Sequence, residues 1–251
     1  MSSFKPITFT SALLLSVWTI SAGIPRVGTE TPKATAGGSI EGRIFFVGTP
    51  PEAERVRVNI DPQVCGSSKT SEEFVVSSEN KGLKNVVVLV DGVGEEPAGA
   101  EVTIEQRECV YLPHVQIAPT GATLVLTNND PMLHNVHGYL VIDEASRRSM
   151  FNIAQPASKD PASPMSSRRT LRRPGVYRIE CDVHPWMLSY VVVHDNQFYA
   201  TSDEGGHYAI SDVPAGTHTV RIWHEGLGMV ERSVTVTDGQ VVTLDLPIEA
   251  N

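Results

Sequence analysis

The sequence predicts an all-β protein, and three features lead to this expectation. Short segments alternate apolar with polar side chains and are rich in Val, Ile, Thr and Tyr, as half-buried strands are. Turn-forming residues, 20 Gly and 17 Pro among 251 residues, lie between these segments. Long amphipathic stretches with helical spacing are few. We therefore expect strands stacked in sandwiches, in one large domain or two small ones.

The N-terminus has the pattern of an export signal. One early cation, Lys5, precedes an apolar run at 7–20, which small residues follow. We expect residues 1–23 to be a signal peptide and 24–37 a linker. An uncleaved anchor is the alternative, because the length of the run lies between those of the two classes. Either way the domain would be periplasmic or otherwise exported, and after signal cleavage no other stretch is long enough to span a membrane.

Two strands joined by a short loop are expected in the region 105–196. Residues 175–181 alternate so that Cys181, at their end, should point into the core. Residues 188–193 form the returning strand, so the loop between the two joins neighbouring strands of one sheet. A further strand at 123–127 ends in a turn-forming Asn-Asn-Asp-Pro run.

The loop and the turn place four potential metal ligands near the ends of these strands. Cys181, His184 and Met187 lie on the loop, and His134 follows the turn. One thiolate, two imidazoles and a weak thioether are the ligand set of a mononuclear electron-transfer copper centre. Zinc is the nearer competitor, but it rarely uses a thioether. The other possibility is that each residue is simply buried, which would require a coincidence of order, spacing and strand context.

This pattern resembles the cupredoxins, in particular plastocyanin and amicyanin. The run Cys-Asp-Val-His-Pro-Trp-Met at 181–187 is similar to the short amicyanin ligand loop, and His134-Asn135 is similar to the upstream His-Asn pair. The resemblance covers residues 105–196. It implies a Greek-key β-sandwich, a type 1 (blue) copper site formed by the four ligands, and a role for Asn135 in steadying the loop.

The remaining histidines are given other roles. His137 lies three residues after His134, and on an extended segment the two side chains would point to opposite faces. We therefore expect His137 to support the site from outside or to lie at the surface. Five further histidines have no convergent partners in the sequence and are expected to be structural or solvated: His114, His194, His207, His218 and His224.

The C-terminal stretch, 197–251, predicts a second β module. Its strands alternate with glycine turns, and an Asp-Gly pair between two alternating runs predicts a hairpin. The pattern resembles carboxypeptidase regulatory-like domains, which are immunoglobulin-like sandwiches without catalytic residues. Strands of such a module are also expected at 38–46 and 85–90, so we expect 38–104 to be its first part. The copper domain would then be inserted into it; consecutive domains are the alternative.

The three cysteines fit an oxidising compartment. If Cys181 binds a metal, Cys65 and Cys109 remain as an even pair that such a compartment would join. Two unrelated buried thiols are the alternative. A net charge of −9 argues against nucleic acid as a partner. Four arginines in the stretch 156–174 predict a solvated loop or edge strand, or a docking patch.

We therefore expect one-electron transfer rather than catalysis, with a redox partner such as a c-type cytochrome or a dehydrogenase. His184 is expected nearest the surface, and Trp186 either forms a docking patch or packs between loops. Two alternatives remain: a copper carrier or store, and an extracytoplasmic scaffold with a structural metal site. No clusters typical of a multicopper oxidase occur. Related sequences are described as methylamine-utilisation-like proteins, but no residue identifies that pathway.

Overall fold

The computed structural model describes residues 37–94, 99–143, 145–160 and 164–249. The expected signal peptide and nearly all of the expected linker lie outside these residues. Within them the protein is nearly all β, as predicted, with strands and one short helix. None of the described helical residues forms a segment long and apolar enough to span a membrane.

Nine strands from the middle of the chain form two facing sheets, here called the central sandwich. The five-stranded sheet has the order β10 (Arg147–Gln155), β9 (His134–Val141), β12 (Gly175–Glu180), β13 (Leu188–His194), β7 (Val115–Pro119). The four-stranded sheet has the order β11 (Met165–Thr170), β8 (Thr123–Asn128), β5 (Glu101–Arg107), β6 (Val110–Leu112). The predicted strands at 123–127, 175–181 and 188–193 are therefore present.

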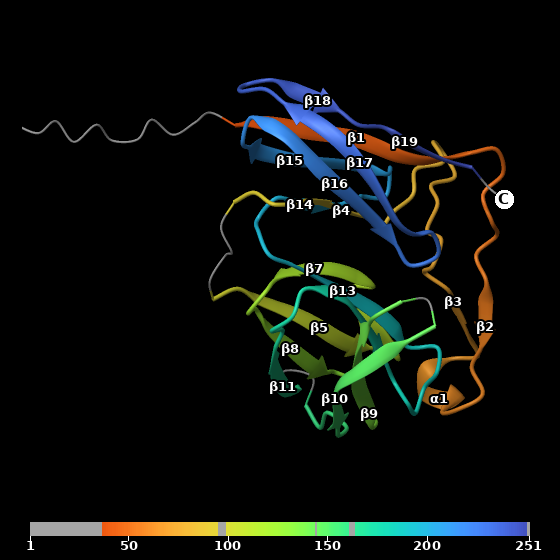
Figure 1. The fold of residues 1–251 in the computed structure, drawn as a ribbon. Helices are drawn as coiled ribbons and strands as arrows, with labels where there is room; N and C mark the ends of the chain where they lie inside the picture. The colour runs from red at the N-terminus through yellow and green to blue at the C-terminus, as the bar shows by residue number, and fades with distance from the viewer. Residues whose placement is uncertain (1–36, 95–98, 144, 161–163, 250–251) are drawn as a thin grey trace, which may run out of the picture. The chain divides into compact units, whose positions relative to one another are not determined.

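Strands from both ends of the described chain form a second pair of sheets, the terminal sandwich (Figure 1). In one sheet β1 (Gly38–Val47) lies between β15 (His207–Val213) and β18 (Val241–Thr243), and β1 also pairs with β19 (Leu246–Glu249). The other has the order β14 (Tyr199–Thr201), β4 (Val87–Val90), β16 (Gly216–His224), β17 (Gly228–Val236). The chain thus leaves this sandwich after β4 and returns at β14.

Two strands are buried on both faces, which explains their continuous apolar sequences. In β4, Val88 and Val90 pack in the core of the terminal sandwich, whereas Val87 and Leu89 belong to a third cluster. In β13, Val191 faces the central core, and Tyr190 and Val192 join that same third cluster. Because successive side chains of a strand point to opposite faces, each strand packs on its own core and on this shared cluster.

The segment between β1 and β4 contributes to the core of the central sandwich. The sequence predicts it as part of the immunoglobulin-like module, and its Val58 and Cys65 pack in the central core. This segment holds β2 (Arg55–Arg57), helix α1 (Pro62–Cys65) and β3 (Ser68–Thr70). The predicted disulfide is present and joins Cys65 to Cys109. The expected start of the copper domain at 105 also falls inside β5.

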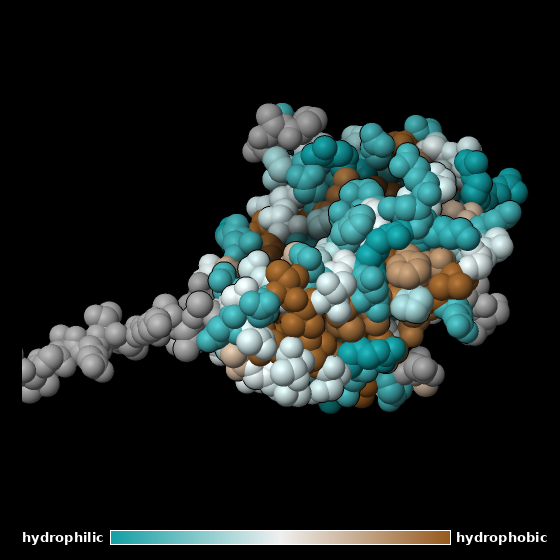
Figure 2. Space-filling model, turned by 90° about the horizontal axis from the view of Figure 1, so that it is seen from above, coloured by the Kyte–Doolittle hydropathy of each residue, from teal (hydrophilic) through white to brown (hydrophobic). Residues whose placement is uncertain are grey.

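The surface mixes polar with apolar side chains. Figure 2, which views the protein from above Figure 1, shows hydrophobic residues reaching the surface in several places between hydrophilic ones. Arg168 and Arg169 lie on β11, which pairs only with β8 among the described strands and is mostly exposed. The edge strand expected for this basic stretch is therefore confirmed at these two arginines.

Candidate metal centre

The ligand loop begins where β12 ends and is closed by its own backbone. Tyr177, Ile179 and Cys181 are buried in alternation, so Cys181 points into the core as predicted. After it the chain turns tightly: the Met187 amide donates to the His184 carbonyl at 2.9 Å, and the Cys181 amide donates to the Met187 carbonyl at 3.4 Å. These hydrogen bonds hold Cys181 close to Met187, and β13 begins at the next residue.

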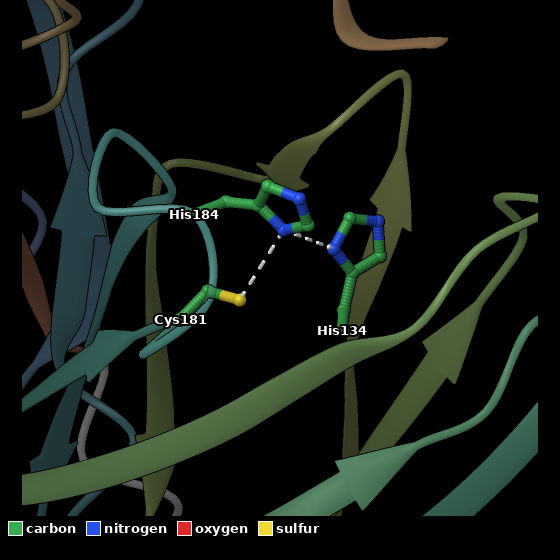
Figure 3. Close-up of side chains that lie close together, drawn as sticks. All are labelled: His134, Cys181 and His184. Carbon is green, nitrogen blue, oxygen red and sulfur yellow. Dashed lines mark hydrogen bonds between the residues drawn. The ribbon is translucent and has the colours of Figure 1, made fainter. Parts of the chain in front are cut away.

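Three of the four predicted ligands converge in the interior of the central sandwich. His134 is the first residue of β9, and its Nδ1 lies 2.9 Å from Nδ1 of His184. The Cys181 Sγ lies 3.7 Å from the same His184 nitrogen. Figure 3 shows Cys181 and His184 facing His134 across a small gap. The ligand atoms of these three buried side chains all lie within 4.8 Å of one another.

The outer ring nitrogen of each histidine faces a carboxylate. Nε2 of His134 lies 2.8 Å from Oδ2 of Asp130, a buried residue in the turn before β9. Nε2 of His184 lies 3.2 Å from Oδ2 of Asp61, which immediately precedes α1. A metal-binding imidazole commonly donates its outer N–H to such a carboxylate, which fixes the tautomer and the ring orientation.

This arrangement tests whether a metal fits the residues. With both outer nitrogens donating to carboxylates, both Nδ1 atoms present lone pairs to each other and to the Cys181 sulfur. Lone pairs 2.9 Å apart require a shared proton or a cation between them. The Cys181 sulfur, 3.7 Å from Nδ1 of His184, adds a third donor of a type that binds soft metal ions. The donor set therefore fits a metal ion.

The pKa shifts of Cys181 and His184 favour the forms of these two side chains that bind a metal. Burial raises the pKa of the Cys181 thiol, but hydrogen bonds to His134 and to nearby backbone groups outweigh it, so the net pKa is lowered. Burial lowers the pKa of the His184 imidazole, and Asp61 offsets this only in part. A thiolate and a neutral imidazole are the forms of these side chains that act as ligands.

His134 and Asp130 behave as a charge-assisted pair. Burial lowers the pKa of His134, but its contacts with Asp130 and Cys181 raise it more, so the net pKa lies above the ordinary value. Burial raises the pKa of Asp130, but His134 and the amides of Cys109 and Glu108 lower it by more, so the net pKa lies below the ordinary value. The proton between the two Nδ1 atoms is thus favoured on His134, and a metal ion would displace it.

Asn135 ties the strand that carries His134 to the ligand loop. Its Oδ1 accepts hydrogen bonds from the Asp182 amide at 2.7 Å and from the Cys181 thiol at 3.4 Å. Its Nδ2 donates to the Asp182 carboxylate at 2.9 Å. The side chain therefore bridges β9 and the start of the loop. This is the steadying role that the resemblance implied for it.

Met187 is the fourth predicted ligand, and it is 1% exposed. Its side chain belongs to the core of the central sandwich, together with Cys181 and Ile179. The residue follows His184 by one tight turn, because its amide donates to the His184 carbonyl. Met187 is thus buried in the same core cluster as Cys181, and its role as an axial ligand stays a prediction.

Two expectations concern the surface of the site, namely the exposure of His184 and the packing of Trp186. His184, expected to be the ligand nearest the surface, has no exposed surface itself, and Asp61, which is 37% exposed, lies against its outer nitrogen. Trp186 is half-buried and packs against the central core, and its indole N–H donates to the Cys109 carbonyl at 3.0 Å. It therefore packs between loops, the second of the two roles considered for it.

The other histidines fall into two groups. His137 contacts Asp182 and Ser149 and is not among the clustered ligands of the described residues. His194 and His218 bond to backbone carbonyls, and His207 is exposed, as structural or solvated residues do. His114 differs from the expectation of no convergent partner, because its ring faces the carboxylates of Glu225 and Glu72.

Asp61 and Asp130 are the site residues that the sequence analysis missed. Asp130 belonged to a run interpreted only as a turn, and Asp61 lies 123 residues before His184. A second group, Cys109, Asp130 and His134, also lies within 4.8 Å. It uses the other nitrogen of His134, and the sulfur of Cys109 is bound in the disulfide. This group is therefore not a second thiolate site.

Comparison with known proteins gives one family match and several structural neighbours. Residues 189–249, from β13 to β19, match the family model of the carboxypeptidase regulatory-like domain. No curated protein sequence matches the chain. Among solved structures, a purple cupredoxin from Nitrosopumilus maritimus is 25% identical, covers 38% of this chain and 99% of its own, and has a TM-score of 0.30.

Two further solved structures have comparable scores. Amicyanin from Paracoccus versutus is 21% identical over 43% of this chain and 97% of its own, with a TM-score of 0.30. A copper-containing nitrite reductase from Thermus scotoductus is 19% identical over 43% of this chain and 25% of its own, also with a TM-score of 0.30. The chain thus combines a carboxypeptidase regulatory-like stretch with structural neighbours among the cupredoxins.

Proposed function

We propose that this protein is an exported type 1 copper protein that transfers single electrons. The observation that supports this most directly is the convergence of two Nδ1 atoms and one Sγ, with both outer nitrogens facing carboxylates. Three neutral or anionic soft donors in a dry interior suit copper, whose two common oxidation states differ by one electron. The ligands in this proposal are His134, Cys181, His184 and Met187.

Each ligand has a distinct role in the proposal. Cys181 supplies the thiolate, and its lowered pKa reduces the free energy needed to deprotonate it. His134 and His184 supply neutral imidazole nitrogens whose direction is fixed by Asp130 and Asp61. Met187 supplies a weak thioether. When bound, copper supplies the one-electron redox chemistry, and the rigid interior keeps the ligands in place in both oxidation states.

The compartment and the partner are further parts of the proposal. The Cys65–Cys109 disulfide is the kind of link that persists outside the cytoplasm, and the apolar run at 7–20 supports export. A net charge of −9 would steer a basic redox partner, such as a c-type cytochrome or a dehydrogenase, to the protein. Association would then slow as ionic strength rises.

The experiment is a one-electron cycle on the copper-loaded protein. The protein is reduced with ascorbate, freed of ascorbate by gel filtration, mixed with an oxidised c-type cytochrome, and followed by stopped-flow absorbance. Wild type is expected to reduce one equivalent of cytochrome, and Cys181→Ser is expected to reduce none. His137→Gln is the matched control, because His137 lies close to the loop but outside the ligand cluster. A wild type that binds copper but does not cycle would contradict electron transfer.

Copper storage or carriage remains the alternative function, and exchange kinetics separate it from electron transfer. A carrier must release its metal, whereas the ring of His184 has no exposed surface. Copper that passes to a chelator within seconds from the wild type would favour the carrier. Retention over hours, with reversible oxidation and reduction, would favour the electron-transfer protein.

A further inference from the structure

The feature that the proposed function does not use is the covering of His184. In the structure its imidazole is 0% exposed, and its Nε2 lies 3.2 Å from Oδ2 of Asp61, whose side chain is 37% exposed. Asp61 therefore lies between the ring and the solvent at the outer nitrogen. The residue does not belong to the strands of the central sandwich, because the segment that carries it lies between β1 and β4.

This covering segment, residues 61–65, is fixed to the central sandwich. The Asp61 carbonyl accepts hydrogen bonds from the amides of Val64 and Cys65, both at 3.0 Å, so the short helix α1 folds directly onto Asp61. Cys65, at the end of the helix, is buried and is joined to Cys109 by the disulfide. The covalent link thus holds Asp61 within a few residues of a fixed point.

The carboxylate of Asp61 has no other structural task that explains its position. The residue occupies the N-cap position of α1, yet its side chain makes no capping hydrogen bond. It has a left-handed backbone with φ of 49°, which Asp tolerates in turns, but this requires no contact with His184. Its Oδ1 accepts a hydrogen bond from Gln63 at 3.3 Å, which leaves Oδ2 for the histidine ring.

On both sides of the site, a carboxylate holds the outer nitrogen of a histidine. Asp130 holds the outer nitrogen of His134, and it also accepts hydrogen bonds from the amides of Glu108 and Cys109. Asp61 holds the outer nitrogen of His184 and lies on the segment that ends at Cys65. The disulfide therefore anchors both carboxylates, one from each of its half-cystines.

We propose that Asp61 is a positioning residue for His184 and shields the outer nitrogen of that ring from solvent. The inference rests on the proposed copper site. Asp61 keeps the proton of His184 on Nε2, so that the Nδ1 lone pair points at Cys181 and His134 before any metal binds. The ring of Trp186, whose centroid lies 5.2 Å from that of His184, packs beside the same imidazole, so Asp61 acts at the outer nitrogen alone.

The first test uses the apo form of the full chain and needs no copper. Nitrogen-15 NMR of the histidine rings is expected to show the His184 proton on Nε2 in the wild type, with slow exchange against solvent. Asp61→Ala is expected to give a mixture of tautomers and fast exchange. Asp61→Asn retains an oxygen acceptor and a residue type that tolerates the left-handed backbone, so it should lie between the two.

The second test measures how fast a chelator removes copper from the loaded protein. Removal of an outer carboxylate partner typically weakens metal binding about 10- to 100-fold, and we expect Asp61→Ala to speed copper removal by a factor in this range. The matched control is Asp212→Ala, because Asp212 is exposed, also has a positive φ of 58°, and lies in the terminal sandwich. This control should leave copper removal unchanged.

Each outcome decides the inference. A wild-type tautomer and wild-type copper removal in Asp61→Ala, with melting temperatures matched to Asp212→Ala, would overturn it. A change in both readouts would support it. If the wild type forms no thiolate–copper centre, the proposed function fails, and the apo NMR of Asp61→Ala still decides whether this carboxylate positions His184.

Discussion

The two sandwiches differ in one cluster of buried polar side chains. In the terminal sandwich, Ser202 donates to the Leu83 carbonyl at 2.7 Å, and the His218 ring contacts the Pro214 carbonyl at 2.7 Å. In the central sandwich, Ser189 and Asn128 likewise donate to backbone carbonyls, but His134, His184 and Cys181 face one another. The first kind of contact completes hydrogen bonds of the fold.

The second kind of contact leaves a requirement that the fold alone does not meet. Two imidazole nitrogens and a sulfur point at a common position, and both rings are held there by carboxylates. Burial of such groups costs free energy, which a bound cation would offset. Among the described residues, the comparison therefore locates the proposed copper site in the central sandwich.

The largest expected effect comes from replacing one buried histidine in each sandwich. His184→Gln removes an inner nitrogen and should lower the affinity for copper by more than about 100-fold, beyond the loss typical of an outer partner. His218→Gln should leave copper affinity unchanged, because the His218 ring bonds to the local Pro214 carbonyl and lies in the terminal sandwich. Competition titration with a copper chelator measures both. Equal losses would remove the distinction between the sandwiches.

Removal of the disulfide tests how the covering segment is tied to the central sandwich. Cys65 and Cys109 are 44 residues apart, for which the chain-entropy model gives about 4 kcal/mol of stabilisation. The double variant Cys65→Ser, Cys109→Ser should lose free energy of unfolding on this scale in denaturant titration. Copper removal by a chelator should also accelerate, because the segment bearing Asp61 loses its anchor. Unchanged stability would contradict the proposed tie.

Matched core substitutions separate stability from function. Ile44 lies in the terminal core and Ile179 in the central core, and both are 0% exposed. Ile→Ala at either position should cost about 2–5 kcal/mol of unfolding free energy. Only Ile179→Ala should also perturb the absorption spectrum of the copper-loaded protein, because Ile179 precedes Cys181 by two residues on the same strand face. A spectral change in Ile44→Ala would show that the terminal core also affects the copper site.

The smallest expected effect concerns pH and the buried pair of His114 and Glu225. Burial lowers the pKa of His114, but Glu225 and Glu72 raise it more, so the folded-state pKa lies above the unfolded value. The stabilisation is therefore complete below the unfolded pKa of about 6.5 and is lost as pH rises through the higher folded value. We expect a loss on the order of 1 kcal/mol.

The measurement for this pair is the unfolding free energy between pH 6.5 and pH 9, for wild type and His114→Gln. The variant should show a smaller decline than the wild type. His224 has the opposite shift, since burial lowers its pKa to about 4, and it would reduce stability only as pH falls below 6.5. His134 also has a raised pKa and contributes in the chosen range, so the difference between wild type and variant measures the part due to His114. An equal decline in both proteins would contradict the assignment to His114.

Much of the site could be predicted from the sequence because its signals are local. Cys181, His184 and Met187 lie on one short loop, and the alternation of β12 determines that Cys181 points inward. His134 was identified through its turn and the following Asn135. The structure brings together the thiol and both imidazoles, as the spacing indicated.

The parts that could not be predicted depend on contacts between distant residues. Asp61 lies 123 residues from His184, and no local pattern distinguishes it from an ordinary turn aspartate. For the same reason, the contact of Asp61 with the ring of His184 could not be predicted. The segment 55–70 was assigned to the terminal module, because neither its charge nor its hydrophobicity shows that Cys65 would enter the central core.

The central claim is that Cys181, His134 and His184 bind copper through the atoms that converge in the structure. The most direct test adds one equivalent of copper(II) to the purified mature protein and records the visible and electron paramagnetic resonance spectra, alongside Cys181→Ser. An intense blue absorption that is absent from the variant is the predicted result. A colourless wild type with only weakly held copper would contradict the account and leave the central sandwich, like the terminal one, as a scaffold.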